Sequence, residues 1–359
     1  MRPIRAAIVG TGTIARLHAE SLQALSDEVS VVAAVDVEGG RLAEFCSRHG
    51  ISVRYPELPA MLECRRPELV HVCTPPNLHC EQALACLRAG ASVVLEKPAT
   101  MSLRELDLLA AEEGGGGPWV ATISQHRFGS GVRRLRAAME QGALGRPLLA
   151  VCHTMWFRDD AYFEIPWRGR WDTEGGGPTM GHGIHQMDVL LAVLGDWVEV
   201  SALAYQQARD TETEDLSVAH VRFANGAVAT VANSVLSPRQ ESYLRFDFER
   251  ATVELSHLYG YGDDDWRISP APGFGEQVLD AWKSGEWGLR SGHRTQIALI
   301  ARSLRAGTPP PVTSADARRT LQLIAGIYAS AFGRRPVRRD ELETDSPFYG
   351  RMKGDGPRW

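Results

Sequence analysis

The feature that most constrains the fold of this chain is a glycine-containing turn near its start, Gly10-Thr11-Gly12-Thr13-Ile14-Ala15. The turn follows Ala6–Val9, an apolar run without a polar break that is typical of a strand covered on both faces. It opens a segment with helical spacing, Ile14–Leu25. The first glycine permits a tight turn, the second lets a diphosphate approach the backbone, and the small third residue lets helix and strand pack closely. The sequence therefore predicts a dinucleotide site at this helix N-terminus.

The first 125 residues continue to alternate apolar runs with helix-period segments. The predicted strands are Val29–Val35, Leu69–Cys73, Ser92–Leu95 and Trp119–Ile123, and the predicted helices are Leu78–Ala89 and Ser102–Glu113. Repetition of strand and helix at this spacing indicates a doubly wound parallel sheet. We therefore expect an α/β architecture with a Rossmann domain over residues 1–125.

From about Pro147 the pattern changes to strand-like segments that no helix separates. They are residues 198–206, 216–223, 227–234, 244–248 and 251–255, and two helices follow at 294–305 and 314–332. Asn225-Gly226, between two of these segments, is a strong signal of a two-residue hairpin. Strands joined by tight turns predict an antiparallel sheet, and so an α+β domain over residues 126–359.

Composition excludes several classes of protein. Lys and Arg number 39 against 44 Asp and Glu, for a net charge of −5. No basic excess exists to displace counterions, so we expect no nucleic-acid partner. No apolar run approaches the roughly 18 residues that span a bilayer, and the opening residues carry no signal-peptide pattern, so we expect a cytoplasmic protein with no membrane partner. The six cysteines contain no CxxC pair and are expected to be reduced thiols.

Asp36 ends the second predicted strand, where a carboxylate accepts hydrogen bonds from the hydroxyls of an adenosine ribose. The 2′-phosphate of NADP would meet its negative charge. The following Val37-Glu38 offers no arginine to offset that charge. The sequence therefore favours NAD over NADP.

Two further segments follow predicted strands at the carboxyl edge of the sheet, where such sheets bind ligands. One is Cys73–His79 and the other is Glu96-Lys97-Pro98. An isolated Glu-Lys pair is usually a solvated surface feature. A lysine fixed by a proline at the mouth of a nucleotide-binding sheet is better placed for chemistry, and we favour that interpretation for Lys97.

The most unusual stretch is Glu174–Asp188, in which Gly175-Gly176-Gly177 precedes two histidines. Three glycines let the backbone come close to another group. A helix predicted to start near Met180 places His182 and His185 one turn apart. A single helical histidine is usually a hydrogen-bonded core residue, but two beside a triple glycine favour a functional site. A metal site is the rival interpretation; no Cys or carboxylate set stands at ligand spacing, so we expect no metal.

Upstream of this stretch, aromatic residues are interleaved with arginines at Trp156, Phe157, Trp167, Arg168, Arg170 and Trp171. Such residues can form core and surface. They can equally form the wall of a sugar site, with flat apolar faces against C–H surfaces and planar donors for hydroxyls. The sequence leaves both interpretations open.

Taken together, these motifs resemble those of the glucose–fructose oxidoreductase / inositol dehydrogenase / rhizopine-catabolism (Gfo/Idh/MocA) oxidoreductases. The matching segments are Gly10–Ala15, Cys73–Asn77, Ala89–Pro98, Gln125–Phe128, Gly175–Asp188 and Ser346–Met352, which together extend over nearly the whole chain. The resemblance implies a Rossmann domain followed by a domain with a large open, mainly antiparallel sheet. It also implies NAD(P)-dependent oxidation or reduction of a secondary alcohol on a sugar or cyclitol.

In that family the lysine of an EKP motif and the histidine of a G-G-G-x-x-x-D-x-G-x-H-x-x-D motif serve the active site, which makes Lys97 and His185 the expected catalytic residues. The family's aspartate, one turn before the histidine in the motif, is replaced here by Gly181. The support that this aspartate gives the histidine must then come from His182, from Lys97 or from a carboxylate that the sequence does not identify. Expected substrate contacts are Lys97, Arg127, Trp167, His182 and His185. Expected cofactor contacts are Gly10, Gly12, Thr13, Ile14, Asp36, Thr74, Pro75, Asn77, His79, Glu96, Lys97 and Gln125.

Two alternatives to a simple dehydrogenase stay open. One is an NAD-recycling glycosidase or lyase, in which a transient 3-keto sugar acidifies the neighbouring C–H and the cofactor is regenerated. The other is a non-catalytic NAD-binding regulator, against which the retention of Lys97 and His185 argues. An open sheet would leave an apolar face uncovered, so we expect a homodimer or homotetramer.

Overall fold

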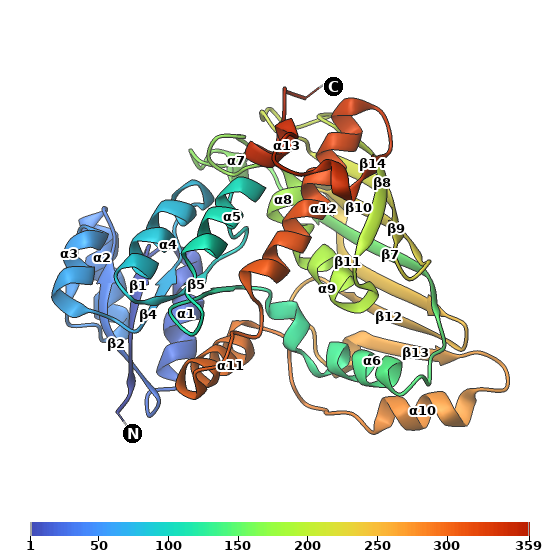
Figure 1. Cartoon of the computed structure of the whole chain (residues 1–359), viewed down its shortest axis with the longest axis horizontal. Coiled ribbons are helices and arrows are strands. Elements are labelled where there is room, and N and C mark those ends of the chain that lie inside the picture. Colours follow the sequence, from blue (N-terminus) through green and yellow to red (C-terminus); the bar gives the residue numbers. More distant parts are fainter. Residues whose placement is uncertain (1, 358) are drawn as a thin grey trace. The chain divides into compact units, whose positions relative to one another are not determined.

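The computed structural model describes residues 2–357 and residue 359 (Figure 1). The chain forms two compact units, each built from two separate stretches. The first unit comprises Met1–Ser124 and His293–Arg318, and the second comprises Gln125–Gly292 and Arg319–Trp359. The chain first passes from one unit to the other near residue 125, where the sequence places the boundary. The return of residues 293–318 to the first unit has no counterpart in the division expected from the sequence.

The first unit is built around a six-stranded parallel sheet with the order β3-β2-β1-β4-β5-β6. Its strands are β1 (Ile4–Val9), β2 (Val29–Val35), β3 (Arg54–Tyr55), β4 (Leu69–Val72), β5 (Ser92–Leu95) and β6 (Val120–Thr122). Its helices are α1 (Thr13–Gln23), α2 (Gly39–His49), α3 (Leu58–Arg65), α4 (His79–Arg88), α5 (Leu103–Glu112) and α11 (His293–Ala306). Strands β4 and β5 are buried along their whole length, as expected where helices cover both faces of a parallel sheet. The doubly wound Rossmann arrangement predicted from the sequence is confirmed.

Helix α11 belongs to the core of the first unit although it comes late in the chain. Ile297, Ile300 and Ala301 are buried in the same hydrophobic cluster as Ile4 of β1 and Ala19 of α1. These apolar residues recur at helical spacing, so one face of α11 packs against α1. The packing carries the first residue of α11 into the interior of the unit.

The second unit contains an eight-stranded sheet with the order β13-β12-β11-β7-β10-β9-β8-β14. Its strands are β7 (Pro147–Phe157), β8 (Trp197–Tyr205), β9 (Leu216–Phe223), β10 (Val228–Ser234), β11 (Leu236–Phe248), β12 (Ala251–His257), β13 (Trp266–Pro270) and β14 (Val337–Arg338). Neighbouring strands pair antiparallel except β7 and β10, which are parallel. The mainly antiparallel sheet is thus confirmed, with the predicted hairpin at Asn225-Gly226, where Gly226 has a φ of +90°. The sequence did not reveal β7, because the polar His153 and Thr154 interrupt its apolar run.

The helices of the second unit are α6 (Ser130–Glu140), α7 (Asp160–Phe163), α8 (Pro178–Gly181), α9 (Ile184–Leu194), α10 (Gly275–Lys283), α13 (Pro347–Gly350) and most of α12 (Ser314–Gly333). The helix predicted from Met180 is in fact two, because the chain turns at His182-Gly183 between α8 and α9. Nearly every residue of α9 is buried, so this helix is enclosed rather than amphipathic. Within the described residues, no helix combines the length and apolar character needed to cross a bilayer.

Candidate functional site

The turn between β1 and α1 has the geometry of a phosphate-binding turn. Gly10 has a φ of +82°, and a Cβ there would lie 2.9 Å from the carbonyl carbon and oxygen of Cys73, so only glycine fits beside β4. Gly12 is the N-cap of α1, and a Cβ there would meet no heavy atom within 4 Å. The open space lies at the positive end of α1, whose first residues are Thr13 and Ile14. The turn therefore fits a dinucleotide diphosphate.

Substitutions at the two glycines should separate folding from binding. Gly10→Ala puts a side chain on left-handed backbone and against Cys73, so we expect the free energy of unfolding to fall by more than about 2 kcal/mol. In Gly12→Val the added Cβ meets no protein heavy atom within 4 Å, and the side chain fills the space for the diphosphate. We therefore expect an unchanged melting temperature and a roughly tenfold or greater loss of NADH affinity. Calorimetry and NADH fluorescence titration measure the two effects. Wild-type NADH affinity in Gly12→Val would contradict this site.

Asp36, just after β2, is buried and heavily hydrogen-bonded. Its Oδ2 accepts from the backbone N–H and the hydroxyl of Thr11, both at 2.8 Å, and its Oδ1 accepts from the N–H of Glu38 at 2.9 Å. The guanidinium of Arg41 donates to both oxygens, at 2.6 Å and 3.1 Å. Burial alone would raise the pKa of Asp36, but these hydrogen bonds, led by that from Arg41, outweigh it and lower the pKa to about 2. Asp36 therefore carries the charge that a ribose diol needs as an acceptor.

Arg41 corrects the sequence argument for NAD over NADP. That argument used the absence of an arginine at Val37-Glu38, but Arg41, five residues after Asp36 and on α2, pairs with the carboxylate. The Arg41 side chain is 49% exposed, whereas that of Asp36 is 4% exposed. The negative charge that a 2′-phosphate would meet is thus partly neutralised by the positive charge of the long, half-exposed Arg41 side chain.

His79 ties together the two segments at the carboxyl edge of the sheet. Its Nδ1 lies 2.9 Å from the carbonyl oxygen of Pro98, and its Nε2 lies 2.8 Å from that of Thr74. The ring is fully buried, and this burial lowers the pKa of His79 in spite of the two carbonyl partners. Of the neighbouring residues expected to contact the cofactor, Thr74 and Pro75 are half-buried and Asn77 is exposed. His79 thus holds the backbone at Thr74 and at Pro98 from the interior of the unit.

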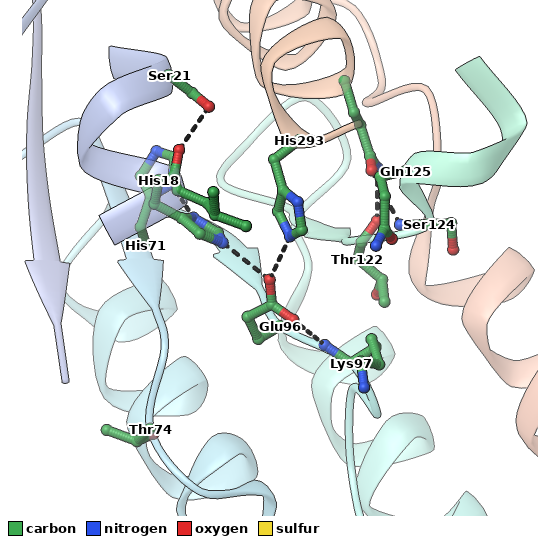
Figure 2. Close-up of polar contacts among 12 residues, drawn as sticks. His18, Ser21, His71, Thr74, Glu96, Lys97, Thr122, Ser124, Gln125 and His293 are labelled. Carbon is green, nitrogen blue, oxygen red and sulfur yellow. Dashed lines mark hydrogen bonds and ion pairs between the residues drawn. The ribbon is translucent and has the colours of Figure 1, made fainter. Parts of the chain in front are cut away.

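Glu96 and Lys97 follow β5 at the same edge (Figure 2). Lys97 is half-buried, whereas Glu96 is 4% exposed. One carboxylate oxygen of Glu96 binds His18 and His293, and the other accepts from the backbone N–H of Lys97. Both oxygens of Glu96 are therefore engaged by the protein itself, and we assign it to holding Lys97 rather than to touching the cofactor.

His18, Glu96 and His293 are the group of three potential metal ligands that the described part of the chain brings together. Each histidine Nε2 lies 2.9 Å from Oε1 of Glu96. Two ligands of a tetrahedral zinc ion, each bound at about 2.0–2.1 Å, lie about 3.3 Å apart. The observed spacing is therefore that of N–H···O hydrogen bonds. His182 and His185, for which the sequence raised the metal alternative, are not in this group.

In the second unit, His185 lies in the first turn of α9 among aromatic rings. Its ring centre is 5.1 Å from that of His126, 5.6 Å from that of Tyr259 and 6.4 Å from that of Trp156. The indole N–H of Trp156, on β7, donates to the hydroxyl of Ser242 at 3.0 Å, and this bond fixes the orientation of the indole beside His185. His185 is 5% exposed. An imidazole in this setting is held in one orientation and shielded from bulk water, which suits directed proton transfer.

The three glycines before α8 serve the packing of the protein itself. A Cβ at Gly176 would overlap the hydroxyl of Tyr328 on α12, and a Cβ at Gly177 would overlap the backbone oxygen of Glu214. Gly175 has a φ of +84°, which favours glycine. The close approach expected from the sequence is therefore an approach to Tyr328 and Glu214. These contacts fix the course of the chain into α8 and α9.

Glu214 is the buried carboxylate that holds this turn. It accepts hydrogen bonds from the N–H groups of Gly177 and Thr179, both at 3.0 Å, and from the hydroxyl of Tyr328 at 2.9 Å. Burial raises the pKa of Glu214 to about 7, and the hydrogen bonds only partly offset that effect. The backbone that leads to His185 is therefore held at Gly177 and Thr179 by a carboxyl group with a pKa of about 7.

This raised pKa predicts a pH-dependent stability. The folded protein holds the Glu214 proton more tightly than the unfolded chain does, so stability should fall as the pH rises from 4.5 to about 7. The loss is roughly 3 kcal/mol over that range. Relative to Glu214→Gln, the melting temperature of the wild type should therefore drop between about pH 5 and about pH 8. Asp264→Asn, a change at an exposed carboxylate, is the control: it keeps Glu214 and should keep the wild-type drop. A drop that persists in Glu214→Gln would rule out Glu214 as the cause.

At Gly181, where the motif lacks its aspartate, another carboxylate is close by. A Cβ at Gly181 would lie 3.5 Å from Oε1 of Glu174. Glu174 is 5% exposed; its Oε2 accepts from the N–H of Gly169 at 2.6 Å, and Arg168 pairs with its Oε1 at 3.4 Å. Gly181 lies four residues before His185, at the end of α8 and across the turn that leads into α9. The carboxylate of Glu174 thus reaches the place from which a side chain at Gly181 would extend.

Arg127 and Gln125 lie in the short segment that opens the second unit. Arg127 donates to both oxygens of Asp188 at 2.6 Å, and Asp188 is 4% exposed. The amide of Gln125 donates to the hydroxyl of Tyr259. The sequence expects Arg127 at the substrate and Gln125 at the cofactor, and the structure shows both held firmly by neighbours within the second unit.

The aromatic residues upstream of the triple glycine divide into two groups. Trp171 packs against Tyr328 and Phe332, whereas Trp167 and Tyr162 lie around Arg168. The Arg168 guanidinium lies 4.3 Å from the ring centre of Trp167 and 3.9 Å from that of Tyr162. The hydroxyl of Tyr162 is 3.3 Å from Nε2 of His182, whose ring centre is 5.1 Å from that of Trp156. The structure thus joins Trp167 and His182, two expected substrate contacts, through Tyr162 and Arg168.

Sequence reasoning missed several polar residues at these sites: His18, Arg41, His71, Glu174, Glu214 and His293. Arg41 lies one turn beyond Glu38 on a helix and could have been found by extending the search along α2. His18 follows Ala15 by three residues on the buried side of α1, which marks it as a buried polar position. His71, Glu214 and His293 carry no local signal, because their partners are distant in the chain. Glu174 bonds to Arg168 and Gly169, only six and five residues away, inside the segment that the sequence marks as unusual.

Both units match models of one protein family. The model described as "Oxidoreductase family, NAD-binding Rossmann fold" matches residues 4–115, and that of the GFO/IDH/MocA C-terminal domain matches residues 132–254. The chain belongs to the Gfo/Idh/MocA oxidoreductase family. The resemblance drawn from the sequence motifs is confirmed, and the first unit is an NAD-binding Rossmann domain.

Individual relatives of this family member are similar over most of its length. Myo-inositol 2-dehydrogenase of Thermotoga maritima is 24% identical over 94% of this chain and 99% of its own, and D-glucoside 3-dehydrogenase of Escherichia coli is 26% identical over 72% and 79%. The WlbA dehydrogenase of Bordetella pertussis, solved with NADH and UDP-GlcNAcA, superimposes with a TM-score of 0.83 at 25% identity over 94% of this chain and 98% of its own. Levoglucosan dehydrogenase, solved with NADH and levoglucosan, shares the fold with a TM-score of 0.81 at 17% identity over 94% and 99%.

Proposed function

We propose that this protein is an NAD-dependent oxidoreductase that oxidises or reduces a secondary hydroxyl or ketone of a sugar, glycoside or cyclitol. The observation that carries the proposal is the position of Lys97. It follows β5, separated from β1 only by β4, so it stands on the same sheet edge as the Gly10–Ala15 turn. The names of the relatives, which are dehydrogenases of inositol and of a glucoside, support the substrate class.

The residues that would hold the cofactor all lie in the first unit apart from Gln125. The open space at Gly12 and the N-terminus of α1 would take the diphosphate, and Asp36 would take the adenosine ribose. Because Arg41 donates to both oxygens of Asp36, its side chain must swing aside for the ribose hydroxyls, which its 49% exposure allows. Bound NAD supplies the acceptor for the hydride that leaves the substrate carbon.

Lys97 and His185 would act on the substrate oxygen. His185 takes the hydroxyl proton, and the ammonium of Lys97 donates a hydrogen bond to the same oxygen and stabilises its developing charge. The rings of Trp167 and Tyr162, each next to the Arg168 guanidinium, would offer flat faces to the sugar, with Arg127 and His182 as polar contacts.

Glu174 completes this proposed site. Its carboxylate lies next to the position of Gly181, four residues before His185, and the residue is 5% exposed. A buried carboxylate there would orient the imidazole of His185 and stabilise its protonated form. We therefore propose that Glu174 takes the part that the family's aspartate plays in the motif.

A panel of sugars, glycosides and cyclitols, assayed with NAD and with NADP by nicotinamide absorbance, tests the proposal. We expect net reduction of NAD with at least one member. Consumption of a glycoside without net reduction would indicate the redox-neutral glycosidase or lyase. NADH binding without conversion of any member would favour a regulator, and a clear preference for NADP would contradict the role given to Asp36.

We also propose a homodimer or homotetramer built on the open face of the second unit's sheet. Leu149, Leu203, Val218 and Val228 share one face of adjoining strands and are 38–48% exposed. Apolar side chains gathered on one face are typical of a surface that is covered in an assembly. Light scattering measures the mass in solution, and a monomer would exclude this arrangement.

A further inference from the structure

The interior of the first unit contains four polar side chains in a hydrogen-bonded line, called here the histidine cluster: His71, His18, Glu96 and His293 (Figure 2). They come from β4, from α1, from the end of β5 and from the first position of α11. Their exposed fractions run from 0% to 6%. Polar groups buried this deeply destabilise a protein unless they form hydrogen bonds, so the loss of any hydrogen bond in the cluster should lower stability.

Glu96 is the centre of the histidine cluster. Its Oε1 accepts from Nε2 of His18 and from Nε2 of His293, each at 2.9 Å, and its Oε2 accepts from the backbone N–H of Lys97 at 3.0 Å. Burial alone would raise the pKa of Glu96, but the two imidazoles hold it well below its ordinary value. Glu96 is thus a carboxylate that can only accept, and both Nε2 atoms must carry a proton.

The proton on Nε2 of His18 fixes the rest of the line. Burial lowers the pKa of His18 and of His71, so both imidazoles are neutral at pH 7. Nδ1 of His18 is then an acceptor, and it lies 2.8 Å from Nδ1 of His71, which donates to it. The whole line is therefore arranged to present donors to Glu96, and the second oxygen of Glu96 is committed to Lys97.

We propose that Glu96, clamped between His18 and His293, is a positioning residue that fixes the backbone at Lys97 and so aims the lysine side chain. The catalytic role of Lys97 rests on the proposed function. The positioning of Lys97 by Glu96, His18 and His293 is independent of that function. Without His293, Oε1 would lose one of two donors, and the buried carboxylate would turn toward other partners. A displacement of about 1 Å at a reacting group can cost about 100-fold in rate.

Lys97 can be observed directly, because the chain has only three lysines, Lys97, Lys283 and Lys353. Reductive methylation with ¹³C-formaldehyde labels them, together with the amino terminus, and keeps their charge. Lys283 is exposed and Lys353 pairs with Asp172. In the full-length protein we expect the Lys97 signal to differ in position from the Lys283 signal, with Lys97→Arg, Lys283→Arg and Lys353→Arg used to assign the signals.

Three variants on α11 test the clamp. In His293→Leu, which removes the donor, we expect the Lys97 signal to move toward that of exposed Lys283. In His293→Gln, whose amide can donate from nearly the same place as Nε2, we expect the wild-type position. Ile300→Val loosens the same helix without touching Glu96, and we expect no movement. An unmoved signal in His293→Leu, a fully moved one in His293→Gln, or equal movement in Ile300→Val would each overturn the proposal.

The wild-type protein gives a second test that needs no variant to fold. ¹H–¹⁵N correlation spectra of the imidazole rings should show a proton on Nε2 of His18 and on Nε2 of His293, each protected from exchange. A Nδ1–H tautomer at His293 would overturn the clamp. NADH affinity should stay within about twofold in all three α11 variants, while turnover in His293→Leu falls by up to about 100-fold. If Lys97→Met keeps full turnover, the proposed function fails, whereas the spectra judge the clamp separately.

Discussion

Replacement of Lys97 by methionine should lower kcat by about 10³-fold. Methionine keeps most of the length of the side chain but can neither donate a hydrogen bond to the substrate oxygen nor stabilise its charge. NADH affinity should change by less than about threefold, because the expected diphosphate and ribose contacts lie at Gly12 and Asp36. Initial rates with a substrate from the panel, together with NADH fluorescence titration, separate the two quantities.

The matched control is Lys283→Met, the same change at an exposed lysine on α10. It should leave kcat and melting temperature unchanged. His185→Ala, which removes the proposed base, should lower kcat by about 10²- to 10³-fold. Near-normal turnover in both Lys97→Met and His185→Ala, with NADH still bound, would show that the site is elsewhere.

Replacement of Glu174 by glutamine should lower kcat by about 10- to 100-fold, because the amide keeps the shape but not the charge that supports protonated His185. Initial rates across a pH series measure the loss. The neighbouring carboxylate at Asp172, which is exposed and pairs with Lys353, gives Asp172→Asn as the control.

The same charge can be moved instead of removed. Gly181→Asp alone puts the Cβ of a second acidic side chain 3.5 Å from Oε1 of Glu174, and two carboxylates in that space oppose each other, so activity should fall. Gly181→Asp combined with Glu174→Gln restores a single carboxylate at this place in the motif, and activity should recover relative to Glu174→Gln. Additive losses in the double variant would contradict the proposed exchange of roles.

The parts of the fold that the sequence revealed are those specified by local pattern. The Gly10–Ala15 turn lies between an unbroken apolar run and a helical period, and both are set by residues close in the chain. Strand β9, residues 216–223, has the predicted bounds because its side chains alternate between the two faces of the sheet. Strand β7 was not predicted, because polar residues interrupt its apolar run. One of them, Thr154, has its hydrogen-bond partner, Gln186, on a distant element.

The same division holds at the site. Lys97 and His185 stand in motifs with recognisable neighbours, and the sequence names both. Gly175-Gly176-Gly177 also stands out, but the groups it approaches, Tyr328 and Glu214, lie far along the chain. The sequence therefore indicated a close approach without its partner. Arg41 was also missed, although it is only five residues from Asp36. The contact forms because α2 begins between the two residues and brings Arg41 back to Asp36.

By itself, the sequence determined the class of the first unit, the dinucleotide turn, the family and the two candidate catalytic residues, because these depend on short segments whose backbone and periodicity are local. Only the tertiary structure decided what surrounds them. It brought His293 to Glu96, Glu174 to Gly181 and Glu214 to the triple glycine. The pairs of Glu96 with His293 and of Glu214 with Gly177 are selected by packing between elements distant in the chain, and that of Glu174 with Gly181 by the turns between them. A buried charge finds its partner only where the fold closes around it.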